Sequence, residues 1–194
     1  MFSKAVFFDK DGTLIPDIPY NVDPAIITLA DGADELLKRL SGKSFRFIVV
    51  SNQSGIARGY FKEEDLAGVK AKLESLFIKE DSHLDGFYYC PHYPMGIIEQ
   101  YSRSCDCRKP QPGMLIKAAR DLQLDLQASW FIGDILNDVE AGNRAGCKTI
   151  LLDNGNETEW IEGEFRKPDF IIKNLREAAD IIESNLWNKL TVKA

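Results

Sequence analysis

Short apolar runs alternate with helical patterns along almost the whole chain, and this alternation limits the possible folds more than any other feature. Each apolar run has the character of a buried strand, and the runs lie at residues 4–8, 45–50, 86–90, 129–133 and 148–152, with a weaker one at 169–172. Apolar residues at helical spacing fill the intervals, at residues 31–40, 63–77, 113–122, 137–146 and 174–186. Because strands joined by helices return in the same direction, we expect an α/β, doubly wound domain with a parallel sheet covered on both faces.

The length and the charge of the chain narrow its class further. Its 194 residues fit one domain of ordinary size, which we expect to span residues 1–194. The formal net charge of -6 argues against nucleic acid as a partner, because proteins that bind it present a surplus of Lys and Arg to the phosphate backbone. The N-terminal apolar run is too short for a signal peptide, and no segment reaches the roughly 20 apolar residues that span a bilayer. We therefore expect a soluble cytoplasmic protein with no membrane partner, and we take it to be a monomer.

Polar residues follow the apolar runs, at the sheet edge where domains of this class bind their ligands. The first run ends in Asp9 and Asp11, two carboxylates separated by one residue and followed by a glycine. Taken alone, this pattern is equally typical of a turn rich in Asp and Gly. Three further clusters favour a site, and they are Ser-Asn-Gln-Ser-Gly at 51–55, Arg-Lys-Pro at 108–110 and Gly-Asp at 133–134. Parallel strands bring these clusters to one edge of the sheet.

Taken in order, the clusters resemble the motifs of the haloacid dehalogenase (HAD) superfamily of phosphohydrolases, as DKDGTL, Ser51, Lys109 and GDILND. Longer strings are similar to the D-glycero-D-manno-heptose 1,7-bisphosphate phosphatases and the related histidinol-phosphate phosphatases, and they read SNQSGIARG, CPHYP and CDCRKPQPGML. The similarity runs from about Phe7 to about Leu152. It implies a HAD-like sheet with strand order 5-4-1-2-3. The segments after the first two motifs are too short for the cap domain that many relatives insert there.

The resemblance implies a phosphomonoester hydrolase that works through a phosphorylated aspartate. Asp9 would be the nucleophile, and Asp11 would be the general acid and base. A carboxylate that attacks a phosphate dianion needs a cation between the two, and Mg²⁺ prefers oxygen ligands. The side chains of Asp9 and Asp134 and the backbone carbonyl of Asp11 would supply such ligands. Ser51 and Lys109 would hold the phosphoryl oxygens.

Two residues close to Asp134, Ile135 and Asp138, bear on the substrate and on the metal site. The position after it holds Ile135, where a lysine is typical of the heptose subgroup. The loss of this cation near the metal bears on substrate identity more than on activity. Asp138 is either a residue that supports the metal ligands or an ordinary acid on a helix surface.

Three of the four cysteines lie in a loop at residues 90–107, here called the zinc loop. With one histidine they offer four donors, Cys90, His92, Cys105 and Cys107. Four such donors suit a closed, structural Zn²⁺ site, with reduced and unliganded thiols as the alternative. Geometry and a reducing compartment disfavour a disulfide between Cys105 and Cys107. The resemblance supports zinc, because members of the family carry it at matching positions.

Without a cap, the loops beyond the strands must recognise the substrate. The candidate substrate-binding residues are Asp17, Tyr20, Asn52, Gln53, Ser54, Arg58 and Arg108. Arg108, a bidentate fork, suits a second anionic group on the substrate. We therefore rank removal of the 7-phosphate of heptose 1,7-bisphosphate first, histidinol phosphate second and another sugar phosphate third.

A noncatalytic phosphate-sensing module is the alternative from another class. Asp11 discriminates between the two, because a hydrolase needs an acid and base that a long-lived phosphoaspartate does not.

Overall fold

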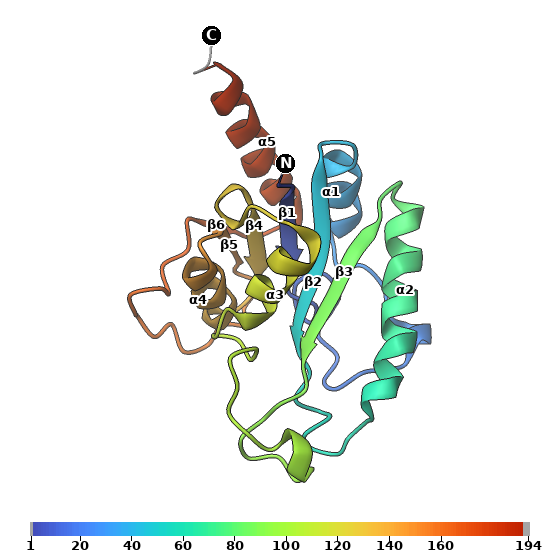
Figure 1. Cartoon of the computed structure of the whole chain (residues 1–194). Helices are drawn as coiled ribbons and strands as arrows, with labels where there is room; N and C mark the ends of the chain where they lie inside the picture. The colour runs from blue at the N-terminus through green and yellow to red at the C-terminus, as the bar shows by residue number, and fades with distance from the viewer. Residues whose placement is uncertain (1, 192–194) are drawn as a thin grey trace.

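The computed structural model describes residues 2–191, and side chains as far as Leu186. Within these residues, six parallel strands form one sheet in the order β3-β2-β1-β4-β5-β6. The strands are β1 (Lys4–Phe8), β2 (Phe45–Asn52), β3 (Leu84–Cys90), β4 (Trp130–Gly133), β5 (Lys148–Leu152) and β6 (Phe170–Ile172). Figure 1 shows the strand arrows ending at the long loops, with β1 inside the sheet. The predicted doubly wound α/β class is confirmed.

The predicted strand order is wrong by one strand. Read from the other edge, the sheet contains the expected order 5-4-1-2-3, but β6 extends it beyond β5. This strand is only three residues long, and it pairs from Ile150 opposite Phe170 to Leu152 opposite Ile172. Its apolar run is short, and the sequence therefore predicts this strand only weakly.

Helices cover both faces of the sheet. They are α1 (Ala33–Leu40), α2 (Leu66–Lys79), α3 (Gly113–Leu122), α4 (Leu136–Ala145) and α5 (Leu175–Thr191). Four short 3-10 helices within the described residues complete the chain, η1 (Pro24–Ile26), η2 (Glu63–Asp65), η3 (Glu99–Tyr101) and η4 (Leu126–Ala128). The apolar side chains of α1, α2 and α5 pack on one face, and those of α3 with Ala141 of α4 pack on the other.

The alternation of side chains along β1 explains why both faces need a cover. Val6 and Phe8 belong to the core under α1, α2 and α5, whereas Ala5 and Phe7 belong to the core under α3. All four side chains have 0% exposure, so the strand is apolar on both sides, as a central parallel strand must be. The first polar position after this run is Asp9, and the fold therefore places it at the carboxyl end of an interior strand.

Helix α1 shows how local chemistry selects these elements. Leu36, Leu37 and Leu40 form its buried stripe. Its first turn is acidic and its last turn is basic, which complements the helix dipole.

The connections are short enough to exclude an inserted cap domain at the two expected places. Residues 9–44 contain η1 and α1, and residues 53–83 contain η2 and α2. In the part of the chain that the structure describes, no helix is both long and apolar enough to pass through a membrane.

Candidate active site

Asp9 begins the loop that leaves β1, and its carboxylate lies buried at the edge of the sheet. The backbone N–H of Asp9 donates to the carbonyl of Ile132, 2.9 Å away, so the residue stays tied to β4. The next residues turn sharply, because the N–H of Gly12 donates to the carbonyl of Ile15 over 2.9 Å. Gly12 has a φ of 82°, and a Cβ there would collide with the carboxylate of Asp134. Glycine at this position therefore lets the turn and β4 approach closely.

Lys109 reaches the same place from the end of the zinc loop. Its ammonium group pairs with the carboxylate of Asp9, lies 2.6 Å from Oδ1 of Asp138, and donates to the carbonyl of Val50 at 3.3 Å. Two hydrogen bonds with the Asn52 side chain fix the backbone of Lys109. The N–H of Lys109 donates to Oδ1 of Asn52 (3.0 Å), and Nδ2 of Asn52 donates to the carbonyl of Lys109 (3.1 Å). The amide of Asn52 therefore holds the lysine at the end of β2.

Asp134 follows β4, and both of its carboxylate oxygens are held. Oδ1 accepts a hydrogen bond from the Thr13 hydroxyl (3.1 Å), and Oδ2 accepts one from the Asn156 amide (2.6 Å). Asn154 donates to the carbonyl of Gly12 over 2.7 Å, so the loop after β5 braces the turn after β1. Thr13 belongs to the DKDGTL motif but has no predicted role of its own, and Asn154 and Asn156 lie in an irregular loop that no sequence pattern marks.

Asp138 is buried, with 1% exposure, which excludes the surface-acid interpretation. Its Oδ2 accepts a hydrogen bond from the backbone N–H of Ile135 (3.3 Å) at the start of α4. Its other oxygen faces Lys109. The residue therefore stands behind Lys109 and fixes the direction of the ammonium group.

Asp9, Asp134 and Asp138 offer carboxylate oxygens that all lie within 4.8 Å of one another. Three carboxylates and the one ammonium of Lys109 would carry a net charge of two negatives when ionised. A divalent cation balances this charge, and Mg²⁺ takes such oxygen ligands together with water. The donor set therefore fits magnesium.

Burial controls the protonation of this cluster. It raises the pKa of Asp9 to about 7 and the pKa of Asp134 to about 6. Burial also raises the pKa of Asp138. The burial of Lys109 by itself would lower its pKa, but the carboxylates of Asp138 and Asp9 outweigh it and raise the pKa above the ordinary value. Lys109 therefore stays an ammonium at neutral pH.

The carboxylate of Asp11 lies apart from this cluster and is held by two other side chains. The Lys10 ammonium group is 2.7 Å from its Oδ1, and the Gln53 amide donates to its Oδ2 over 3.2 Å. The same amide donates to the hydroxyl of Ser51 over 2.6 Å. Gln53 thus links the carboxylate beside the predicted nucleophile to the predicted phosphate-binding hydroxyl. Lys10, which is 1% exposed, was not marked by the sequence, although a buried lysine needs a partner.

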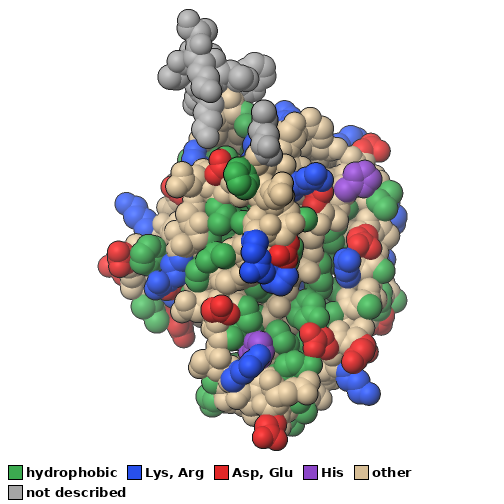
Figure 2. Space-filling model, viewed as in Figure 1, with side chains coloured by type: hydrophobic (Ala, Val, Ile, Leu, Met, Phe, Trp, Pro, Cys, Tyr) green, Lys and Arg blue, Asp and Glu red, His purple; other side chains and the backbone are tan. Residues whose placement is uncertain are grey.

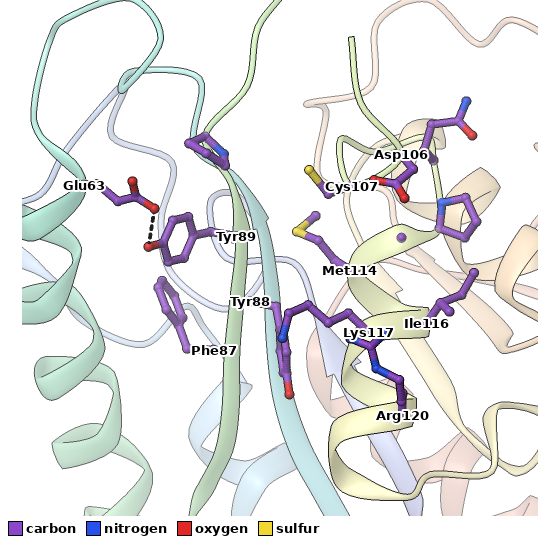
Figure 3. Close-up of a pocket in the computed structure, with 14 residues that line it drawn as sticks. Glu63, Phe87, Tyr88, Tyr89, Asp106, Cys107, Met114, Ile116, Lys117 and Arg120 are labelled. Carbon is purple, nitrogen blue, oxygen red and sulfur yellow. Dashed lines mark hydrogen bonds between the residues drawn. The ribbon is translucent and has the colours of Figure 1, made fainter. Parts of the chain in front are cut away.

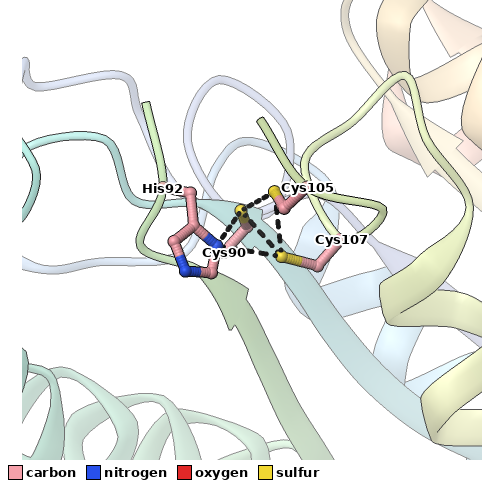
Figure 4. Close-up of side chains that lie close together, drawn as sticks. All are labelled: Cys90, His92, Cys105 and Cys107. Atoms are coloured by element: carbon pink, nitrogen blue, oxygen red, sulfur yellow. Dashed lines mark hydrogen bonds between the residues drawn. The ribbon is translucent and has the colours of Figure 1, made fainter. Parts of the chain in front are cut away.

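The four predicted zinc ligands come together (Figure 4). The Sγ atoms lie 3.4 Å apart for Cys90 and Cys105, 3.0 Å for Cys90 and Cys107, and 3.2 Å for Cys105 and Cys107. Nδ1 of His92 is 3.7 Å from Sγ of Cys90 and 3.4 Å from Sγ of Cys107. Ligands about 2.3 Å from a tetrahedral zinc lie ~3.8 Å from each other, so the four donors are close enough to share one ion but would have to spread apart to bind it.

The chemistry of the thiols also suits a metal. No disulfide joins the cysteines, all four of which are free. The hydrogen bond between Cys107 and Cys90 lowers the pKa of Cys107 to about 5 and raises the pKa of Cys90. One thiol of the group is therefore ready to act as a thiolate ligand. The residues present fit zinc.

The predicted substrate-binding side chains do not all lie together. The guanidinium groups of Arg58 and Arg108 both lie over the ring of Tyr93, with their central carbons 4.1 and 5.3 Å from its centroid. Tyr20 packs edge-on against Tyr60, with ring centroids 4.6 Å apart. Asp17 instead lines a separate cavity of about 350 Å³. The backbone N–H of Arg58 donates a hydrogen bond to the carbonyl of Ser54 (3.0 Å).

A larger cavity of about 760 Å³ lies on the far side of β3 from the carboxylates. Figure 3 shows its lining residues, which come from η2, β3, the end of the zinc loop and α3. It includes Cys107 but none of the predicted catalytic residues. Within it the carboxylate of Glu63 accepts a hydrogen bond from the Tyr89 hydroxyl (2.8 Å), a contact that joins η2 to β3. The size of this cavity therefore does not make it the reaction site.

Acidic and basic side chains are interspersed over the face of the molecule in Figure 2, without a continuous basic patch on that face. This distribution agrees with the negative net charge. It suits a small anionic ligand bound by a local cluster of cations better than a nucleic acid backbone.

Comparisons with known sequences converge on one family. The family model described as HAD-hydrolase-like matches residues 106–178. A relative from Haemophilus ducreyi, named D-glycero-beta-D-manno-heptose-1,7-bisphosphate 7-phosphatase, is 42% identical over 176 residues, which are 90% of this chain and 96% of the relative. The protein of the same name from Escherichia coli strain K12 is 36% identical over 179 residues, covering 92% of this chain and 93% of its own.

Solved structures agree with the sequences. A putative HAD-like phosphatase from Mesorhizobium loti superposes with a TM-score of 0.81 and 33% identity, over 94% of this chain and 87% of that one. The D,D-heptose 1.7-bisphosphate phosphatase from B. bronchiseptica, complexed with magnesium and phosphate, gives a TM-score of 0.80 and 28% identity, over 94% and 99%.

Magnesium should stabilise the folded protein more at about pH 8 than at about pH 5. The raised pKa values of Asp9 and Asp134 mean that the folded protein without Mg²⁺ holds protons there, which it must release to bind the ion. Because the folded pKa values lie above the ordinary value of 3.8, the stability of the magnesium-free protein falls as the pH rises from about 4 to about 7. Above that pH range, Mg²⁺ at 100 times its Kd should increase the free energy of unfolding by about 2.7 kcal/mol.

Thermal unfolding with and without MgCl₂ at the two pH values measures this difference. The Asp134→Asn protein, which lacks a proposed ligand, is the control and should gain little at either pH. An equal rise in Tm at both pH values would contradict the protonation that burial imposes on these carboxylates.

Purified protein should contain about one zinc per chain, and the Cys105→Ser/Cys107→Ser double variant should contain almost none. Two of the four donors are removed, and the loop that they hold should lose stability as well. Elemental analysis of protein prepared without chelator measures the metal. Cys147→Ala is the matched control, since this buried cysteine lies outside the cluster. The zinc assignment is wrong if the double variant contains as much zinc as the unaltered protein.

Proposed function

The chain belongs to the HAD-like hydrolases and is a phosphoric monoester hydrolase, and from that premise we propose that it removes the 7-phosphate of D-glycero-D-manno-heptose 1,7-bisphosphate through a phosphorylated Asp9. One observation carries the proposal. The ammonium group of Lys109 pairs with the buried carboxylate of Asp9, while Asp134 lies within metal-ligand distance of the same carboxylate. The name that the curated relatives share supplies the substrate.

In the first half of the reaction, an oxygen of Asp9 attacks the phosphorus and the bond to the leaving alcohol breaks. Asp11 in its acid form gives its proton to the leaving oxygen. In the second half, Asp11 takes a proton from a water molecule, which attacks the same phosphorus and releases inorganic phosphate. The carboxylate of Asp9 returns unchanged, so the cycle consumes one water per phosphate.

The carboxylate of Asp9 must be ionised to attack, although burial raises its pKa. Lys109 favours the ionised form through its ion pair with Asp9. We infer that Mg²⁺ is held by the side chains of Asp9 and Asp134 and by the backbone carbonyl of Asp11. When bound, it supplies positive charge between the attacking carboxylate and the phosphate.

Asp138 belongs with Lys109 rather than with the metal in this proposal. Its Oδ1 lies 2.6 Å from the ammonium group and so directs it. Ser51 and Lys109 would hold the phosphoryl oxygens as negative charge shifts during transfer. Gln53 positions the hydroxyl of Ser51 for that contact, because its amide already donates to it.

The second phosphate of the substrate would bind to Arg58 and Arg108. Neither arginine forms a salt bridge with a carboxylate in the described part of the chain. Both guanidinium groups are therefore available to an external anion. The backbone of Ser54 and the side chains of Asn52 and Tyr20 would shape the sugar site around them, whereas Asp17 lines the separate cavity.

Histidinol phosphate and other sugar phosphates are the second and third candidate substrates, and they carry only one phosphate or lack the heptose. The family places the chain among enzymes, which leaves the noncatalytic phosphate-sensing module without support. A single domain, a monomeric state and a cytoplasmic location remain predictions, and residues 1 and 192–194 of the predicted domain lie outside the described residues.

Replacing Asp9 by Asn should lower kcat by about 10⁴-fold or more, because the amide cannot form the phosphorylated intermediate. Steady-state assays with p-nitrophenyl phosphate measure the loss, while circular dichroism and zinc content check that the fold is kept. Asp121→Asn, at an exposed aspartate on α3, is the matched control and should keep full activity. Appreciable turnover by the Asp9→Asn protein would exclude this residue as the nucleophile.

A substrate panel should rank the heptose bisphosphate above histidinol phosphate by kcat/KM. Two guanidinium groups bind the second phosphate of the bisphosphate, and charge-assisted bidentate contacts contribute about 1.5–3 kcal/mol each. We expect a preference of about tenfold or more, measured by phosphate release at matched concentrations with both anomers of the heptose. A higher kcat/KM for histidinol phosphate would replace the first candidate by the second.

A further inference from the structure

Tyr93 brings together Arg58 and Arg108, neither of which forms a salt bridge with a carboxylate of the described residues. Its ring lies under the guanidinium group of Arg58 and under that of Arg108, at 4.1 and 5.3 Å between the guanidinium carbon and the ring centroid. The two arginines come from distant segments, one after β2 and one after the zinc loop. The ring is the feature of the fold that they share.

The ring also lies against the guanidinium group of Arg58, which has few other fixed partners to direct it. The Nε atom of Arg58 is buried and has no hydrogen-bond partner among the described residues. An arginine side chain loses substantial rotamer entropy when it is fixed, and two like charges repel when they are brought together. The negative face of an aromatic ring offsets part of both costs, by an amount typical of a cation–π contact.

Backbone contacts fix the ring in turn. The N–H of Tyr93 donates to the carbonyl of Tyr101 (3.1 Å), and its carbonyl accepts the N–H of Gly96 (3.0 Å). Tyr93 follows His92 directly, and the guanidinium group of Arg108 donates to the carbonyl of His92 over 3.4 Å. The ring and Arg108 are therefore each one residue away from a proposed zinc ligand.

The loop that carries Arg58 is fastened to the same segment. The carbonyl of Ala57 accepts the N–H groups of Ile97 (2.8 Å) and Ile98 (3.0 Å). A Cβ on Gly96 would lie 2.6 Å from this carbonyl, so a glycine there lets the two loops meet. Backbone hydrogen bonds thus fasten the two loops to each other beside the strand ends.

We propose that Tyr93 is a positioning residue, whose ring holds Arg58 and Arg108 in the arrangement that binds the second anionic group of the substrate. This inference rests on the proposed function, because it assigns a residue to the same site. It also gives the zinc loop a role in specificity, since the zinc ligand His92 sets the place of the ring. Tyr93 acts on the affinity for the second phosphate and leaves the phosphoryl transfer at Asp9 unchanged.

The test compares Tyr93→Leu with the unaltered enzyme on two substrates, heptose 1,7-bisphosphate and p-nitrophenyl phosphate. Loss of the ring should raise KM for the bisphosphate about tenfold, in line with one or two cation–π contacts, and change kcat less than about twofold. The kcat/KM for p-nitrophenyl phosphate, which has no second anion, should stay the same. Tyr93→Phe keeps the ring and should restore the KM for the bisphosphate.

Tyr88→Leu is the matched control, since Tyr88 also lies under a cation, with Nζ of Lys117 5.1 Å from its centroid, but on the far side of β3. It should behave as the unaltered enzyme on both substrates. An unchanged KM for the bisphosphate in Tyr93→Leu, an equal loss on both substrates, or a loss of zinc from that variant would overturn the positioning role. If the kcat/KM of the unaltered enzyme is no higher for heptose 1,7-bisphosphate than for p-nitrophenyl phosphate, the proposed function is wrong, and so is the role of Tyr93.

Discussion

The ion pair between Lys109 and Asp9 is the interaction on which the rest of the site depends. Both groups are almost fully buried, and a buried charge without a partner is costly. The lysine comes from a long irregular loop, whereas the aspartate ends an interior strand of the sheet. The loop must therefore be held rigidly enough to deliver an ammonium group to one oxygen, and Asn52, Asp138 and the backbone of Val50 each contribute to that.

Zinc held by the cysteine and histidine cluster would give the loop this rigidity. A loop of this length has few apolar contacts of its own, and a bound zinc replaces them by fixing four side chains at once. The last proposed ligand, Cys107, is followed by Arg108 and Lys109, so the proposed zinc site lies two residues from the buried ion pair. The proposed zinc site in the loop therefore helps to position Lys109 beside Asp9 at the strand ends.

The sequence was enough to predict the parallel α/β class and the grouping of Asp9, Lys109 and Asp134, because their positions follow from strand ends and from motifs. It also predicted that the four zinc donors would meet. It did not reveal Asn156, which holds Asp134 from an irregular loop 22 residues away, nor the pairing of Lys10 with Asp11. The sequence also did not predict a role for Tyr93, because its contacts join distant segments and no local pattern shows that these lie together. The short β6 was underestimated for want of a strong apolar run.

The most direct test of the central claim is to locate the phosphoryl group during turnover. Asp11→Asn protein should retain it when given p-nitrophenyl phosphate, whose leaving group needs no acid, because removal of the general base slows hydrolysis of the intermediate. Borohydride reduction converts a phosphorylated aspartate to homoserine, and the tryptic peptide of residues 5–10 contains Asp9 as its only acidic residue. The account predicts the reduced residue in that peptide. An unmodified peptide 5–10 together with a modified residue elsewhere in the chain would contradict it.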